Sequence, residues 1–328
     1  MKTMLSLNEI TIIPAKVSRV RSRKDVDPYE ENGKLPVFVA PMTCILNDKN
    51  IDTFNDSLVI PIEPVDFFSP NYGMLNMDGT WKALTLKQFK YWFIEENAQK
   101  GNAYYVLIDC ANGHMKILYD MVVQAKQNYG KMLHVMVGNI ANPDTYEICC
   151  ETGVDYVRVG IGGGSGCTTS VLTGCHASMP YLLYNINKTR KQRISENKFC
   201  TKVIADGGID SIAKIIKCLA LGADYVMCGK MFAYCEEAGD LCNDGIHKQY
   251  YGQASHMGQL DRLGKITSPV EGTISSIVSK YTLDMLCCDI EAALRSAMSY
   301  CDCVTLGEFI GNVETCRQSV NEFVQYEK

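Results

Sequence analysis

Short apolar runs recur along the chain, and segments with the periodicity of amphipathic helices lie between them. Seven runs are clear, at positions 35–40, 58–62, 104–108, 133–137, 155–159, 202–205 and 224–227, and a weaker eighth lies at 81–84. Continuous apolar runs, rather than alternating ones, are typical of parallel strands that are buried on both faces. The pattern therefore predicts up to eight buried strands joined by helices.

Two of the intervening segments have recognisable helix ends. Asn142-Pro143 predicts an N-cap and a first-turn proline for a helix that ends at Gly153. Ser211 predicts the start of a second helix, with isoleucine and leucine on one face and an end at Gly222. Because strand and helix alternate about eight times with a repeat of roughly 20 to 30 residues, we expect an α/β fold of the (β/α)8 TIM-barrel type.

A doubly wound dinucleotide-binding sheet is the alternative fold. That fold requires Gly-x-Gly-x-x-Gly after an early strand, with an acidic residue about 20 positions later. Here the glycine-rich loop lies in the middle of the chain and has Ser165 at the third glycine position. A phosphate loop of the Gly-x-x-x-x-Gly-Lys type is also absent from the sequence.

Length and composition suit a single large domain. The chain has 328 residues, of which 47% are hydrophobic, so we expect one catalytic barrel over 1–328. The net charge of −5, with acidic and basic residues interspersed, argues against nucleic acid as a partner. No apolar run approaches the roughly 20 residues of a membrane helix, so we expect no membrane association.

Cysteine usage indicates a reducing compartment. Sixteen cysteines are scattered through the chain, without any Cys-x-x-Cys pair and without histidines at zinc-ligand spacing. The N-terminus lacks the apolar core of a secretion signal. We therefore expect a cytoplasmic protein without structural zinc.

Glycine, aspartate or asparagine follows nearly every predicted strand, where a barrel carries its active site. These strand ends are 40–42, 109–113, 138–139, 160–169, 206–208 and 228–230. We interpret Asn142 and Asp210 as helix caps. The glycines at 207, 208 and 229 follow the last two strands, where barrel enzymes commonly hold a phosphate.

The loop at 160–169, Gly-Ile-Gly-Gly-Gly-Ser-Gly-Cys-Thr-Thr, directly follows the fifth of the clear runs. Glycines allow backbone N–H groups to approach an anion closely, and such donors also favour a thiolate. Cys167 is therefore a candidate nucleophile, and the alternative is a buried structural thiol. A further segment, 243–271, is polar and lacks a long apolar period, so we predict a long loop that forms a mobile flap at about 243–272.

The 160–169 loop, followed by Thr173-Gly174, resembles the cysteine loop of the IMP dehydrogenase and GMP reductase family. The matching motifs continue in the family's order, at 138–139, 205–209, 226–229, 251–252 and 271–272. The chain has no room for the regulatory modules usual in the dehydrogenases, and the flap has no Arg-Tyr pair. In these two absences, and in the strand end Asp109-Cys110-Ala111-Asn112-Gly113, the chain is most similar to the reductase branch of the family.

The resemblance implies chemistry at carbon 2 of a purine. Cys167 would attack that carbon of GMP, ammonia would leave, and NADPH would supply hydride to give IMP. Thr169 and Glu271 would form the proton relay. The substrate would be bound by Ser165, Asp206, Gly207, Gly208, Gly229, Lys230, Gly252, Gln253, Ala254 and Gly272.

The same matching assigns the remaining ligands. NADPH would be contacted by Ser22, Arg23, Asp109, Cys110 and Ala111. Carbonyl groups of Gly162, Gly164 and Cys167 would hold a monovalent cation such as K⁺. The resemblance also implies a homotetramer.

Four positions depart from the family pattern. Gly163 stands in place of proline, Lys230 in place of glycine or serine, Thr43 in place of aspartate and Ser170 in place of arginine. The sequence therefore leaves two other functions open: an IMP dehydrogenase without regulatory modules, which would convert IMP to XMP with NAD, and a barrel that binds purine nucleotides without turnover.

Overall fold

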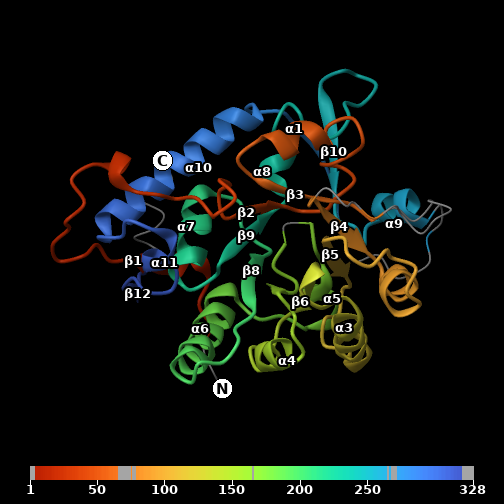
Figure 1. Cartoon of the computed structure of the whole chain (residues 1–328). Helices are drawn as coiled ribbons and strands as arrows, with labels where there is room; N and C mark the ends of the chain where they lie inside the picture. The colour runs from red at the N-terminus through yellow and green to blue at the C-terminus, as the bar shows by residue number, and fades with distance from the viewer. Residues whose placement is uncertain are drawn as a thin grey trace.

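Eight parallel strands close into a barrel, as the hydrophobic pattern predicts (Figure 1). The computed structural model describes residues 4–65, 75, 79–164, 166–263, 266 and 272–319. The barrel strands are β2 Val37–Val39, β3 Ile60–Glu63, β4 Trp81–Leu84, β5 Tyr104–Asp109, β6 Leu133–Ile140, β7 Tyr156–Val159, β8 Lys202–Asp206 and β9 Tyr225–Cys228. Each strand coincides with one of the eight predicted runs, and β9 closes the barrel by pairing with β2.

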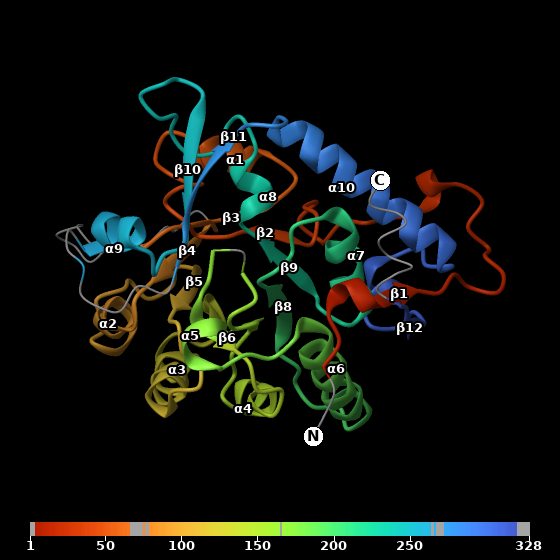
Figure 2. The same cartoon turned by 180° about the vertical axis from the view of Figure 1, so that it is seen from behind.

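Helices surround the barrel and connect its strands (Figures 1 and 2). Those between barrel strands are α1 Ile51–Asp56, α2 Leu86–Phe89, α3 Lys116–Tyr129, α4 Thr145–Glu151, α5 Thr169–Thr173, α6 Met179–Ser195 and α7 Ile212–Ala220. Those after β9 are α8 Lys230–Ala233, α9 His256–Leu263, α10 Leu283–Tyr300 and α11 Leu306–Phe309. Near the chain ends, β1 Ile10–Ile12 pairs with β12 Thr315–Arg317. None of the helices in these described ranges is long and apolar enough to cross a membrane.

Strand alternation gives the barrel two separate apolar cores. Inward-facing residues such as Leu107, Met136 and Ile204 fill the barrel, whereas their neighbours pack outward against the helices. The inward face of β7 carries Tyr156 and then Arg158, because side chains two positions apart share one face of a strand. Arg158 is therefore inside the barrel at the carboxyl end, where it is only 9% exposed.

A repeated ionic arrangement fixes two helices to the opposite, amino end. Asp155, just before β7, accepts a hydrogen bond from the Val135 N–H (2.7 Å) and pairs with Lys126 of α3. Asp224, just before β9, accepts from the Val203 N–H (2.6 Å) and pairs with Arg190 of α6 at 2.9 Å. Each carboxylate thus joins a neighbouring strand to a surrounding helix.

Both predicted helix caps need correction. The helix expected from Asn142 begins later, at Thr145, because the Asn142 side chain accepts the Asp144 N–H (3.0 Å) and forms a turn instead. Ser211, not Asp210, is the N-cap residue of α7. Asp210 pairs with Lys214 one helical turn away (2.7 Å).

The prediction of a continuous loop over 243–271 was wrong. This segment contains β10 His247–Tyr251 and α9, and β10 pairs with β11 Ile274–Val278 in an antiparallel ribbon beside α1 and α8 (Figure 2). Burial of Lys248, Tyr250 and Tyr251 stabilises this ribbon. Whether the segment moves as a flap, and whether 1–328 is one domain, stay predictions.

Close backbone contact at Gly160 generates the first test. Its φ is +129°, and an added Cβ would lie 2.0 Å from the Asp206 carbonyl oxygen. Gly160→Ala is expected to lower the free energy of unfolding by about 3 kcal/mol, from left-handed strain plus overpacking. Urea denaturation measures this change. Gly174→Ala is the control, since Gly174 has φ +73° and no neighbouring atom within 4 Å; equal losses in the two variants would contradict the close contact.

Candidate active site

A cavity of about 660 Å³ opens at the carboxyl end of the barrel. Its lining comes from the ends of β2 and β5 to β9 and from the segment after β10, which meet although they are far apart in sequence. Residues 160–164, 166 and 167 of the predicted cysteine loop form one side. Cavities of this size hold small molecules and cofactors.

The cysteine loop is held against its neighbours by backbone contacts. A Cβ on Gly208 would meet the Gly163 carbonyl oxygen at 2.7 Å, and one on Gly252 would meet the Gly166 oxygen at 3.1 Å. The Gly166 carbonyl also accepts the Thr273 N–H (3.0 Å). Glycine at these positions therefore lets the loop, the end of β8 and the β10–β11 ribbon come together.

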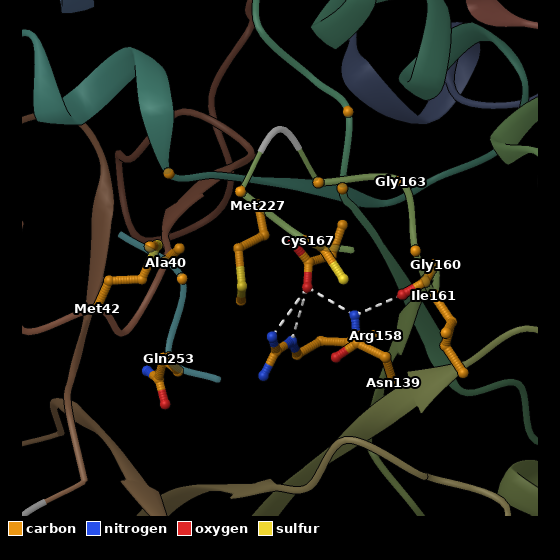
Figure 3. A pocket seen from close by; sticks show the side chains of 18 of the residues that line it. Ala40, Met42, Asn139, Arg158, Gly160, Ile161, Gly163, Cys167, Met227 and Gln253 are labelled. Carbon is orange, nitrogen blue, oxygen red and sulfur yellow. Dashed lines mark hydrogen bonds and ion pairs between the residues drawn. The ribbon is translucent and has the colours of Figure 1, made fainter. Parts of the chain in front are cut away.

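Cys167 lies half-buried on the cavity wall (Figure 3). Its thiol donates a hydrogen bond to the Thr169 hydroxyl (3.2 Å), and its backbone pairs in antiparallel fashion with Gly272. The cysteine thus has a hydroxyl within reach for proton transfer and is held by the ribbon on its other side. Glu271, the predicted relay partner, directly precedes Gly272 in sequence but lies outside the described residues, as does Ser165.

Arg158 connects two carboxylates at the floor of the cavity. Its guanidinium donates to Asp109 (2.9 Å) and, through Nε and Nη2, to Asp206 at 3.2 and 2.9 Å. Asn139 donates to the same Asp206 oxygen and to the Gly160 carbonyl, both at 2.7 Å. Figure 3 shows Arg158 and Asn139 converging below Cys167. The two carboxylates raise the pKa of Arg158, so it stays protonated at every accessible pH.

One part of the cavity is suited to an anion. The wall there is formed by the backbone of Gly207, Gly208 and Gly229 and by the residues Lys230 and Lys214. Lys214 is paired with Asp210. In the described part of the chain, no acidic partner of Lys230 is found, so its charge is available to a ligand.

Gln253 offers an unused acceptor beside the cavity. Its amide nitrogen donates to the Pro41 carbonyl, which fixes the orientation of the amide. Its Oε1 is buried and has no hydrogen-bond partner among the described residues. A buried acceptor without a partner costs about 1–3 kcal/mol, and a ligand N–H or O–H could remove that cost.

The other thiols near the cavity are poor nucleophiles. Burial and the neighbouring Asp109 raise the pKa of Cys110 to about 11, and its thiol donates to the Gly138 carbonyl (3.3 Å). Burial also raises the pKa of Cys228 well above its ordinary value. Both thiols therefore stay protonated near neutral pH.

The structure brings most predicted residues together. Those lining the cavity are Gly162, Gly164, Cys167, Thr169, Asp206, Gly207, Gly208, Gly229, Lys230, Gly252, Gln253, Ala254, Asp109, Cys110 and Ala111. Ser22 and Arg23 do not line it: Ser22 caps a short helical turn, and Arg23 lies in a separate surface depression next to Cys288 and Arg295 of α10. Arg158 was not among the predicted site residues; its inward position two residues after Tyr156 was the available signal.

Two of the predicted cation ligands already accept hydrogen bonds. The Gly162 carbonyl accepts from the Ser170 hydroxyl (3.1 Å), and the Gly164 carbonyl accepts from the Cys167 N–H (3.0 Å). Each carbonyl oxygen keeps a second lone pair. Among the residues described, no group of three or more His, Cys, Asp or Glu side chains could hold a metal ion.

Residues 96–325 match the IMP dehydrogenase / GMP reductase domain. The chain belongs to this family. The resemblance drawn from the motifs is therefore confirmed.

Individual relatives lie in both branches. The chain is 30% identical over 320 residues to GMP reductase from Clostridium acetobutylicum, and the aligned region covers 92% of this chain and 91% of the relative. It is 28% identical over 322 residues to GMP reductase from Bacillus subtilis, covering 92% of each. It is also 34% identical over 227 residues to inosine-5'-monophosphate dehydrogenase from Chlorobaculum parvum, covering 65% of this chain and 44% of that enzyme's length.

The pKa of Cys110 gives a test of the site. Because this pKa is raised to about 11, the alkylation rate of Cys110 should rise about tenfold per pH unit from pH 7 to 10. Iodoacetamide labelling followed by peptide mass spectrometry measures this rate. A plateau below pH 9 would contradict the buried, Asp109-facing position of the thiol.

Proposed function

We propose that this chain catalyses the NADPH-dependent reductive deamination of GMP to IMP and ammonia. The observation that carries the proposal is the placement of Cys167, with the Thr169 hydroxyl at 3.2 Å, on the wall of a glycine-lined cavity at the carboxyl end of the barrel. Relatives named GMP reductase align with 92% of the chain, whereas the dehydrogenase from Chlorobaculum parvum aligns with 65%. This difference in coverage favours the reductase.

The residues of the cavity suit a nucleoside monophosphate. The phosphate would lie against the backbone at Gly207, Gly208 and Gly229, with Lys230 adding a positive charge. Asp206 would accept hydrogen bonds from the ribose hydroxyls through Oδ1, because Oδ2 is bound to Arg158 and Asn139. The base would then lie towards Cys167 and the segment 252–254, where the Gln253 oxygen is available to a donor.

The reaction balances with these groups. The Cys167 thiolate forms a bond to carbon 2 of the purine, and the amino group leaves as ammonia after protonation. A hydride then adds to carbon 2 and the carbon–sulfur bond breaks, which releases IMP and restores the thiolate. Thr169 would relay the proton that the departing amine needs, with Glu271 as its acidic partner.

The cavity also fits the reacting half of a nicotinamide cofactor, which supplies the hydride when bound. Asp109 keeps Oδ2 without a partner in the described chain, and Cys110 and Ala111 lie next to it on the cavity wall. These groups would hold a ribose or an amide beside Cys167. Ser22 and Arg23 of the same chain lie elsewhere, so their contact with NADPH requires a second copy, as in the expected homotetramer.

The carbonyl groups of Gly162, Gly164 and Cys167 would hold K⁺ beside the cysteine loop. Ser170 occupies the position where the family commonly has arginine, and it keeps the loop closed by its bond to Gly162. A cytoplasmic location agrees with the free thiol state of all sixteen cysteines.

Paired absorbance assays test the function. GMP with NADPH should give a loss of absorbance at the nicotinamide band, whereas IMP with NAD should give no gain. NAD reduction without NADPH oxidation would instead establish a dehydrogenase, which the 34% identity to the Chlorobaculum parvum enzyme keeps as the second candidate. Nucleotide binding without either reaction would indicate a non-catalytic barrel.

Two substitutions separate the roles of the thiol and the hydroxyl. Cys167→Ala should abolish NADPH oxidation while GMP still binds, because only the nucleophile is lost. Thr169→Val should lower kcat about 100-fold with little change in GMP affinity, since a proton relay typically contributes 10²- to 10⁴-fold. Stopped-flow absorbance and calorimetry provide the two measurements. Thr173→Val is the control, because the Thr173 hydroxyl bonds only backbone groups, donating to the Thr169 carbonyl and accepting from the Cys175 N–H. Retained activity in Cys167→Ala would remove Cys167 as the nucleophile.

A further inference from the structure

Arg158 physically joins the two sides of the cavity. On one side it contacts Asp206 of β8, which adjoins the glycines of the anion-binding part. On the other side it contacts Asp109 of β5, which adjoins Cys110 and Ala111. Asp109 and Asp206 come from non-adjacent strands, and Arg158 on β7 spans the distance between them.

The fold itself gives no reason for charges at this level of the barrel. The inward positions just below are apolar, with Leu107 beneath Asp109 on β5 and Ile204 beneath Asp206 on β8. Replacing buried ion pairs by well-packed apolar residues is often neutral or stabilising. Three charged side chains, with exposed fractions of 11% for Arg158, 16% for Asp109 and 18% for Asp206, therefore indicate a function in ligand binding.

In each of the two carboxylates, one oxygen is hydrogen-bonded to a described residue and the other is not. Arg158 and Asn139 both bind Oδ2 of Asp206, and Arg158 binds Oδ1 of Asp109. Within the described chain, Oδ1 of Asp206 and Oδ2 of Asp109 have no hydrogen-bond partner, and both side chains line the cavity. The rigid guanidinium fork thus fixes the direction of two free acceptor oxygens at once.

We propose that Arg158 is a positioning residue that holds Asp206 as the acceptor for the nucleotide and Asp109 as the acceptor for the nicotinamide cofactor. This inference rests on the proposed function. It makes both ligands depend on one side chain that need not touch either of them. Lysine cannot replace this arginine fully, because a single ammonium lacks the planar fork.

Ligand binding in the full chain tests the proposal. All variants carry Cys167→Ala, so that no turnover occurs, and calorimetry measures GMP first and then NADPH at saturating GMP. Arg158→Gln should weaken GMP and NADPH about 10- to 100-fold each, as expected from the loss of charged hydrogen bonds. Asp206→Asn should weaken chiefly GMP, Asp109→Asn chiefly NADPH, and Arg158→Lys should give intermediate affinities for both.

A double substitution shows whether Arg158 acts through Asp206. GMP binding by Arg158→Gln combined with Asp206→Asn should be no weaker than with the more damaging single substitution, because both remove the same oriented acceptor. Arg190→Gln is the matched control: it removes an equally buried arginine–aspartate pair at the other end of the barrel. Thermal melting checks that each variant is folded.

The outcomes are distinguishable. Selective loss of both ligands in Arg158→Gln, partial rescue by lysine and non-additivity with Asp206→Asn support the inference. Unchanged affinities in Arg158→Gln, or equal losses in Arg190→Gln, overturn it while the proposed function stands. Failure of the parent Cys167→Ala chain to bind GMP overturns the proposed function, and the inference with it.

Discussion

The candidate site depends on contact of backbone with backbone around the cysteine loop. Gly160 lies against the Asp206 carbonyl, Gly163 against Gly208, and Gly166 against Gly252. A Cβ at Gly160 or Gly208 would clash with the carbonyl oxygen of the facing segment. Their approach places Cys167 on the same wall as the end of β8 and fixes it to the β10–β11 ribbon through Gly272. Main-chain packing, more than any side chain, therefore determines where the thiol can act.

Charge at the cavity floor provides the second constraint. The barrel interior changes from apolar to ionic between successive inward-facing positions: Leu107 is followed by Asp109 on β5, and Ile204 by Asp206 on β8. Arg158 neutralises part of this charge and leaves a net negative floor, and the rim above it carries the positive charge of Lys230. A ligand with a phosphate at one end and hydroxyl groups in the middle would complement both features.

The sequence predicts the barrel well because its parallel strands are buried on both faces and form continuous apolar runs. It predicts the candidate site because strand ends meet at one end of any such barrel, whatever the details of the helices. Arg158 was missed because it interrupts an apolar run by one residue, and its importance depends on partners 49 and 48 positions away. The β10–β11 ribbon was missed for a similar reason, since its two short strands are stable only when paired with each other. Ser22 and Arg23 lie outside the cavity of one chain, so the cofactor contact expected of them stays a prediction.

Protection of Cys167 by nucleotide is the most direct test of the central claim, that this thiol lies over a bound purine nucleotide. The measurement is iodoacetamide labelling of each cysteine, with and without saturating GMP, resolved by peptide mass spectrometry. GMP should slow the labelling of Cys167 at least tenfold and leave exposed Cys288 and Cys316 unchanged. Equal labelling of Cys167 with and without bound GMP would contradict the account.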